Sequence, residues 1–219
     1  MSVARSLLAL VLLPAALALS SCGLVESIAE DFVDDQDVTL FAASGLSGSV
    51  VRTTGGTDVS AQPDVLAAGD LVAGTQVLGV IAIRIDGTQQ PDKTSLDSIR
   101  LRFWVEVSSG DPAPLGPLVV SHLPDHPDLP LAVGQVPHPP GNDIATITDV
   151  TTSGWREVNV TSAFLSDWNS DDTVSAFAVR LATPTDGDAT ADVIALQGDD
   201  DGSGNPAVPH VILHFGVDL

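Results

Sequence analysis

The sequence predicts an all-β protein: an antiparallel β-sandwich of the jelly-roll type with about eight or nine strands. Two observations carry this prediction. One segment in the middle of the chain alternates strictly between apolar and mainly polar side chains, and from residue 38 onward short apolar segments are separated by turn residues without a long helical pattern. The 219 residues are 44% hydrophobic, which is enough for a packed core.

The alternating segment covers residues 99–107. Its apolar set is Ile99, Leu101, Phe103, Val105 and Val107, and its other set is Arg100, Arg102, Trp104 and Glu106. A period of two is typical of a strand that has one face in a core and the other face outside it. We expect a central strand here, paired with residues 79–86.

The remaining strands are predicted to be short, with a single helical turn at residues 162–168. They are expected at residues 38–42, 50–52, 77–86, 144–150, 155–161, 174–181, 192–196 and 208–217.

Residues 109–141 hold nine of the fifteen prolines and interrupt this pattern. Proline lacks the N–H that a strand donates to its neighbour, so a central strand is not expected here. We interpret the segment as an ordered loop insertion, with residues 118–121 and 131–136 as short edge strands. The alternative is a linker between two domains.

The first residues have the features of a secretory signal peptide. Arg5 precedes an apolar run at residues 7–19, and small residues follow. The sequence Leu-Ser-Ser-Cys at residues 19–22 resembles a bacterial lipobox, and Cys22 is the only cysteine of the chain. We expect a signal peptide at residues 1–21 and a lipidated Cys22, carrying acyl chains such as palmitate. An ordinary signal peptide with an incidental cysteine is the alternative.

This organisation predicts a lipoprotein of the bacterial cell envelope, anchored by its lipid at the outer membrane or cell surface. Residues 22–37 would form an acidic tether and residues 38–219 the β-sandwich domain. The formal charge is −21, and cleavage before Cys22 leaves 29 acidic and seven basic residues, a charge of −22. Such a surface repels nucleic acid and anionic headgroups, so we expect no nucleic acid partner and membrane contact only through the lipid.

Four segments occur in an order that resembles DNRLRE-type domains, which belong with jelly-roll carbohydrate-binding modules. They are residues 79–86 (Gly-Val-Ile-Ala-Ile-Arg-Ile-Asp), 96–107, 154–161 with Phe164 and Trp168, and 207–215 (Ala-Val-Pro-His-Val-Ile-Leu-His-Phe). The resemblance covers residues 38–217, lacks the string that names the family, and departs from it in the proline-rich insertion. It implies an extracellular β-sandwich without catalytic residues, with polysaccharide as the ligand class.

Trp104 is the candidate ligand-binding residue, flanked on its face of the strand by Arg100, Arg102 and Glu106. Sugar binding needs a flat apolar ring with polar groups at its rim. The alternative is that this face is covered by another part of the chain. Trp155 and Trp168 are expected in the core.

The candidate metal site is an acidic loop that offers Asp199, Asp201, Ser203 and Asn205 as ligands. Asp199, Asp201 and Ser203 have the spacing of the first ligands of an EF-hand loop, with Gly204 at the sharp turn, and such oxygen ligands suit Ca²⁺. His210 stands where that loop has its bidentate glutamate, and a solvated acidic turn is the alternative. Asp186, Asp188 and Asp192 form a second, weaker acidic cluster.

No segment has the pattern of a catalytic nucleophile with its base, so we do not expect an enzyme. We predict a cell-surface lipoprotein with a binding or adhesion module, with polysaccharide as the ligand. The alternative is a structural or assembly component of the cell envelope that binds a protein partner through the proline-rich insertion, without a small ligand.

Overall fold

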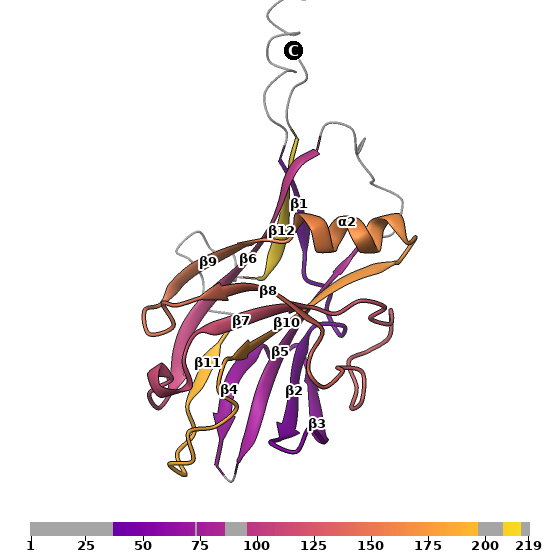
Figure 1. The fold of residues 1–219 in the computed structure, drawn as a ribbon. Coiled ribbons are helices and arrows are strands. Elements are labelled where there is room, and N and C mark those ends of the chain that lie inside the picture. The colour runs from indigo at the N-terminus through magenta and orange to yellow at the C-terminus, as the bar shows by residue number, and fades with distance from the viewer. Residues whose placement is uncertain (1–36, 73, 86–95, 197–207, 216–219) are drawn as a thin grey trace, which may run out of the picture.

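A computed structural model describes residues 37–72, 74–85, 96–196 and 208–215. This part of the chain consists mainly of antiparallel strands (Figure 1). The predicted fold class, an all-β antiparallel sandwich, is confirmed. The described residues contain twelve strands rather than eight or nine.

The strands are β1 (Val38–Phe41), β2 (Gly48–Thr53), β3 (Asp58–Pro63), β4 (Ala67–Leu71), β5 (Thr75–Arg84), β6 (Leu96–Ser109), β7 (Leu118–His122), β8 (Asn142–Ile147), β9 (Gly154–Asn159), β10 (Val174–Leu181), β11 (Val193–Ala195) and β12 (His210–Phe215). The helical elements are a 3₁₀ turn, η3 (Ala113–Leu115), and an α-helix, α2 (Thr161–Asn169).

The strands form two layers that are joined at one side. One layer has the order β1-β12-β6-β9, and the other has β8-β7-β10-β5-β2-β3, with β4 also paired to β5. Strand β11 pairs with β6 on one side and β4 on the other, so it links both layers into one open antiparallel sheet. In Figure 1 the β1 layer lies above β4, β5 and β2.

The main core lies between these layers. The predicted alternation of β6 is confirmed over residues 99–105, because Ile99, Leu101, Phe103 and Val105 are each 0% exposed. Val107, the last residue of the predicted apolar set, is only half-buried. The same core contains apolar residues of β5, β7, β10 and β12. The expected pairing of residues 79–86 with this strand is wrong: β6 pairs with β12, β9 and β11. Both β5 and β6 contribute apolar faces to the core, so they pack across it rather than side by side.

A second, smaller core covers the outer face of β5 and β10. Here the proline-rich insertion contributes Leu123, Leu131 and Val136, which pack against a set from the two strands, Val80, Ala82, Ala176 and Ala178. The two strands are therefore buried on both faces, which explains why both read as nearly continuous apolar runs.

The insertion differs from its prediction in two places. Residues 118–121 belong to β7, which is not an edge strand, because it pairs with both β10 and β8. Strand β7 contains no proline, so its N–H donors are intact. Residues 131–136 form no strand. Strands β3 and β4 were missed, because their half-exposed or small residues lack a clear apolar alternation.

The predicted helical turn is instead the nine-residue helix α2. Its first residue, Thr161, accepts a hydrogen bond from the Ile99 amide at 2.9 Å through its hydroxyl oxygen. Phe164 and Trp168, one turn apart, point into the main core with their rings 5.9 Å apart. Among the described residues, no helix combines the length and apolar character that crossing a membrane requires.

Candidate functional site

Four aromatic rings form a row on the outward face of the β1 layer. Trp104 of β6 and Trp155 of β9 are cross-strand partners, with ring centroids 5.7 Å apart and planes at 89°. Trp155 meets His210 of β12 at 5.4 Å, and His210 meets Phe41 of β1 at 5.7 Å. We call these four residues the aromatic row. It joins one residue from each of the four strands.

Charged groups border this row. The Arg102 guanidinium lies 4.9 Å from the Trp155 ring centroid, in cation–π contact. Glu157 Oε1 lies 3.4 Å from Arg100 Nη1, and its Oε2 lies 3.9 Å from Arg102 Nε. The structure thus puts Arg100, Arg102, Trp104 and Glu106 on one outward face, half-buried except for the exposed Glu106.

The expectation for Trp155 is wrong and that for Trp168 is confirmed. Trp155 is half-buried in the aromatic row, because it stands directly opposite Trp104 in the β6–β9 pair. Trp168 is 4% exposed and belongs to the main core. Phe41 and His210 were missed as site residues. The sequence around these two residues indicates strands but not which strands are neighbours. Only the register of the strands in the sheet brings them beside Trp104 and Trp155.

The His210 ring has a defined orientation. Its Nδ1 lies 2.9 Å from the Val208 carbonyl oxygen, and a carbonyl only accepts, so Nδ1 carries the proton. In the neutral ring, Nε2 is therefore a hydrogen-bond acceptor. It adds a polar group to the aromatic row.

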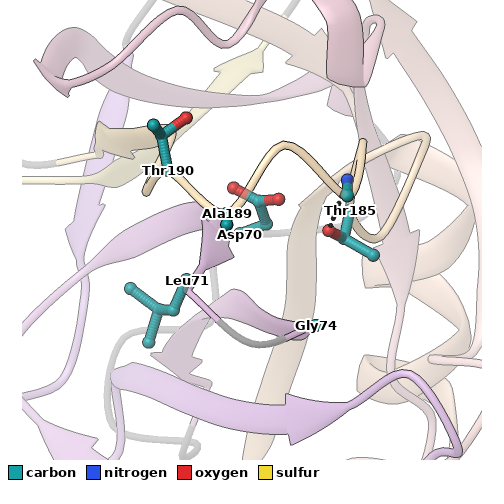
Figure 2. Close-up of a pocket in the computed structure, with 7 residues that line it drawn as sticks. Asp70, Leu71, Gly74, Thr185, Ala189 and Thr190 are labelled. Carbon is teal, nitrogen blue, oxygen red and sulfur yellow. Dashed lines mark hydrogen bonds between the residues drawn. The ribbon is translucent and has the colours of Figure 1, made fainter.

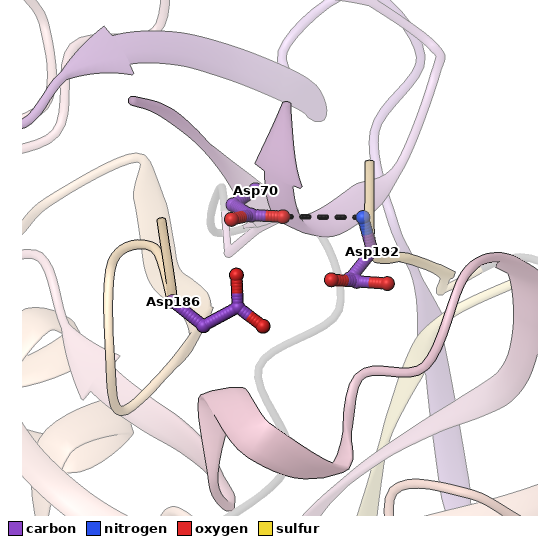
Figure 3. A group of neighbouring side chains, drawn as sticks. All are labelled: Asp70, Asp186 and Asp192. Atoms are coloured by element: carbon purple, nitrogen blue, oxygen red, sulfur yellow. Dashed lines mark hydrogen bonds between the residues drawn. The ribbon is translucent and has the colours of Figure 1, made fainter. Parts of the chain in front are cut away.

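A second candidate site is a group of three carboxylates, which we call the acidic cluster: Asp70 of β4, Asp186 in the β10–β11 connection, and Asp192 just before β11. One oxygen of each lies within 4.8 Å of the others (Figure 3). Asp70 is 1% exposed and Asp192 2%, whereas Asp186 is exposed.

Backbone amides hold two of these carboxylates in position. The Asp192 amide donates to Asp70 Oδ1 at 3.1 Å, and the Asp111 amide donates to Asp192 Oδ1 at 2.5 Å. The Asp70 amide donates in turn to the Asp192 carbonyl oxygen at 3.0 Å. Strand β4 and the start of β11 are thereby locked together, and the two carboxylates are brought close to each other.

A small cavity of about 90 Å³ adjoins Asp70 (Figure 2). Apart from Leu71, the other residues that line the cavity are small or polar. They are Gly74, Thr185, Gly187, Ala189 and Thr190. Such a cavity has room for an ion or a few water molecules.

The charges of the acidic cluster act on one another. The hydrogen bond from the Asp111 amide lowers the pKa of Asp192. Burial and the nearby carboxylates of Asp188, Asp70 and Asp186 raise it, and together they outweigh the hydrogen bond, so the pKa of Asp192 lies above its ordinary value. Asp188 behaves differently. Hydrogen bonds from the Thr190 hydroxyl, at 2.6 Å, and amide lower the pKa of Asp188.

The acidic cluster therefore contains other residues than the sequence predicted. Asp186 and Asp192 meet as expected, but Asp188 bonds to Thr190 and is replaced by Asp70. Asp70 and Asp192 lie 122 residues apart in the chain, and no sequence signal connects them. The predicted metal ligands Asp199, Asp201, Ser203 and Asn205 and the lipidation residue Cys22 lie outside the described residues.

A buried polar network joins α2 to β7 and β10. His122 Nε2 donates to Asp167 Oδ1 at 2.8 Å, and the Ser175 hydroxyl donates to Asp167 Oδ2 at 2.6 Å. In a catalytic triad the serine contacts the histidine, which then takes its proton. Here the carboxylate is central and accepts from both neighbours, so the geometry is that of a structural link.

The chain matches no family model, and no curated protein is found to be similar in sequence. The resemblance to DNRLRE-type domains therefore stays a prediction drawn from the residues quoted above.

Proposed function

We propose that the protein is a cell-surface lipoprotein whose β-sandwich binds polysaccharide through the aromatic row. The observation that carries this proposal is the contact of Trp104, Trp155, His210 and Phe41 on one outward sheet face. Phe41 is 62% exposed, so its ring offers open apolar surface at one end of the aromatic row.

The chemistry of the face suits a sugar chain. The C–H faces of sugar rings pack on aromatic rings, while hydroxyl groups need hydrogen-bond partners at the rim. Arg100, Arg102 and Glu157 offer charged donors and acceptors beside the tryptophans, and His210 Nε2 offers one more. Neighbouring strands lie about 4.8 Å apart, so the four strands extend over roughly 14 Å, which fits several linked sugars.

The anchor belongs to the same proposal. Lipidation of Cys22 would hold the domain at the membrane, and the acidic residues 23–37 would separate it from the bilayer, because like charges repel. The sandwich would then present the aromatic row to polymers of the cell surface.

A protein partner in the envelope is the second candidate. The proline-rich insertion exposes two large apolar side chains, Leu129 at 58% and Val133 at 52%. Trp, Phe and Arg residues are also enriched in protein interfaces, so the aromatic row fits this function as well.

A glycan array probed with the purified protein, together with crosslinking in intact cells, tests the proposal. The matched variants are Trp104→Ala in the aromatic row and Leu129→Ala on the insertion. Polysaccharide binding that is lost only with Trp104→Ala supports the first function. Absence of glycan binding, with a crosslinked envelope protein that is lost in Leu129→Ala, would replace it by the second.

A further inference from the structure

His126 is the one buried side chain in a short loop of the proline-rich insertion, residues 124–130, which we call the His126 loop. It is 7% exposed, whereas its neighbours in the loop are exposed apart from the half-buried Pro127. Neither ring nitrogen of His126 has a hydrogen-bond partner in the described part of the chain. Buried polar atoms are normally hydrogen-bonded, and a charged ring without a partner would cost far more here than a neutral one.

Few other contacts attach the His126 loop to the sheet. The Arg84–Asp128 ion pair of 2.8 Å is partly exposed, so it stabilises the loop only weakly. Among the described residues, no backbone hydrogen bond joins residues 124–130 to a strand, and the Leu129 amide donates to the Pro127 carbonyl oxygen within the loop. Segments with few buried contacts open locally at a low free energy. The burial of His126 is therefore the main attachment of this loop.

The surroundings of His126 favour its neutral form. The charged and titratable groups of the neighbouring elements are Asp125 and Asp128 of the loop, Arg84 of β5, His122 of β7, Asp167 of α2, and Asp171 and Asp172 before β10. Burial lowers the pKa of His126 below its ordinary value, and none of these groups opposes that effect. In an open loop the ring would be in water beside Asp125 and Asp128, which favour its charged form.

We propose that the His126 loop is an acid-sensitive latch of the proline-rich insertion. With a neutral ring the loop is closed against the sheet. In mild acid the ring takes up a proton and leaves its buried position, and the loop opens. Opening uncovers the two leucines that flank the loop, Leu123 and Leu131, which are 2% and 4% exposed in the second core.

The pH range of the latch follows from the proton uptake of its two forms. The open loop binds the proton at the ordinary histidine pKa of about 6.5, and the closed loop binds it only at a lower pKa. The closed form is therefore most stable above about pH 6.5 and loses stability as pH falls toward the lowered pKa. Over that range each pH unit shifts the equilibrium up to about tenfold toward the open loop. The latch does not depend on the proposed polysaccharide binding.

Amide hydrogen exchange of the purified full-length protein, followed by NMR between pH 5 and 8, tests the latch. The reporters are the amides of Leu129 and Leu131, and the latter donates to the Gly45 carbonyl oxygen at 2.8 Å. After correction for the intrinsic pH dependence of exchange, their protection should fall about tenfold as pH falls from 6.5 to 5. The Leu123 amide donates to the Ala176 carbonyl oxygen at 2.9 Å and, as the internal control, should stay protected.

Two variants separate His126 from other titrating groups. His126→Phe introduces an apolar ring that takes up no proton, so it should abolish the pH dependence of protection. His138→Gln is the matched control, because His138 is an exposed histidine of the same insertion, and it should keep the wild-type response. The proposal is overturned if wild-type protection stays constant from pH 8 to 5, a result that requires no variant to fold. It is also overturned if the pH dependence survives in His126→Phe.

Discussion

Arg52 of β2 and Asp58 of β3 form an ion pair of 2.5 Å in which the two side chains are only 1% and 5% exposed. Both partners also hold the proline-rich insertion. Arg52 donates to the carbonyl oxygens of Pro137, at 2.8 Å, and Val136, and Asp58 accepts from the Gly134 amide at 3.0 Å. A single buried pair thus connects a β-hairpin with a segment that lies about 80 residues further along the chain.

Replacing this arginine should destabilise the protein strongly. Arg52→Met leaves Asp58 buried without a counter-charge, so we expect a loss of about 3–5 kcal/mol in the free energy of unfolding. Arg84→Met is the control, because the Arg84–Asp128 pair is partly exposed and should contribute less than about 1 kcal/mol. Urea denaturation measures both values. Equal losses in the two variants would contradict the assigned role of Arg52.

The second core predicts a contrast between two leucines of the insertion. Leu131 is 4% exposed and packs on the sheet, so Leu131→Ala should cost about 2–4 kcal/mol. Leu129 is 58% exposed, and Leu129→Ala should change the stability by less than about 0.5 kcal/mol. If neither variant changes the urea midpoint, the insertion does not contribute to the core.

Trp104→Ala should lower the affinity for polysaccharide about tenfold, because an aromatic contact contributes roughly 1–1.5 kcal/mol. Val59→Ala is the control, since Val59 is an exposed apolar residue of the other layer, 59% accessible on β3. Isothermal calorimetry with a polysaccharide identified on the array measures both affinities. A Trp104→Ala variant that binds as well as wild type would remove the aromatic row as the site.

Asp172 should give the protein a pH dependence of opposite sign to that of a paired acid. Desolvation raises its pKa above the ordinary value, and the neighbouring Asp167, Asp125 and Asp171 add to this, against a smaller opposing effect of His122. The folded state then binds more protons than the unfolded state, so this group lowers stability as pH rises from about 4 through the raised pKa.

Asp172→Asn should remove this decrease, which urea midpoints between pH 4 and 7 would record. Asp149→Asn is the mirrored control. The hydrogen bond from the Thr152 hydroxyl lowers the pKa of Asp149. The ionised Asp149 therefore stabilises the protein at pH values above the ordinary carboxyl pKa, and this stabilisation is lost as pH falls through the lowered pKa. Identical pH profiles for wild type and Asp172→Asn would refute the assignment.

Cys22→Ser should move the protein from the membrane fraction to the soluble fraction of the cell. The proposed acyl chains would be attached through this thiol, and each buried CH₂ would contribute about 0.8 kcal/mol to anchoring. Fractionation followed by immunodetection gives the result. Persistent membrane association of the variant would show that the anchor lies elsewhere.

The strands with the clearest sequence signals were predicted well. In β6 the alternation of Ile99, Leu101 and Phe103 with arginines identified both the strand and its buried face. Strands β3 and β4 were not predicted, because at a half-exposed edge or in small residues such as Ala68 and Gly69 the period of two is weak.

The candidate sites show the same division. Trp104 could be selected from the sequence, because its face of β6 is defined by its neighbours. Trp155 was expected in the core, since nothing in its own strand indicates that it stands opposite Trp104. Asp70 could not be selected at all, because its partner Asp192 is far away in the chain and meets it only through the pairing of β4 with β11.

By itself the sequence determined the all-β class, the buried face of β6, and the expectation of a lipid anchor at Cys22, because these depend on local periodicity and on short motifs. The tertiary structure decided which strands are neighbours, that the proline-rich insertion covers β5 and β10, and that three aspartates converge. Those features depend on strand register and on contacts between distant segments, and the free energy of such contacts is not encoded in any single stretch of the chain.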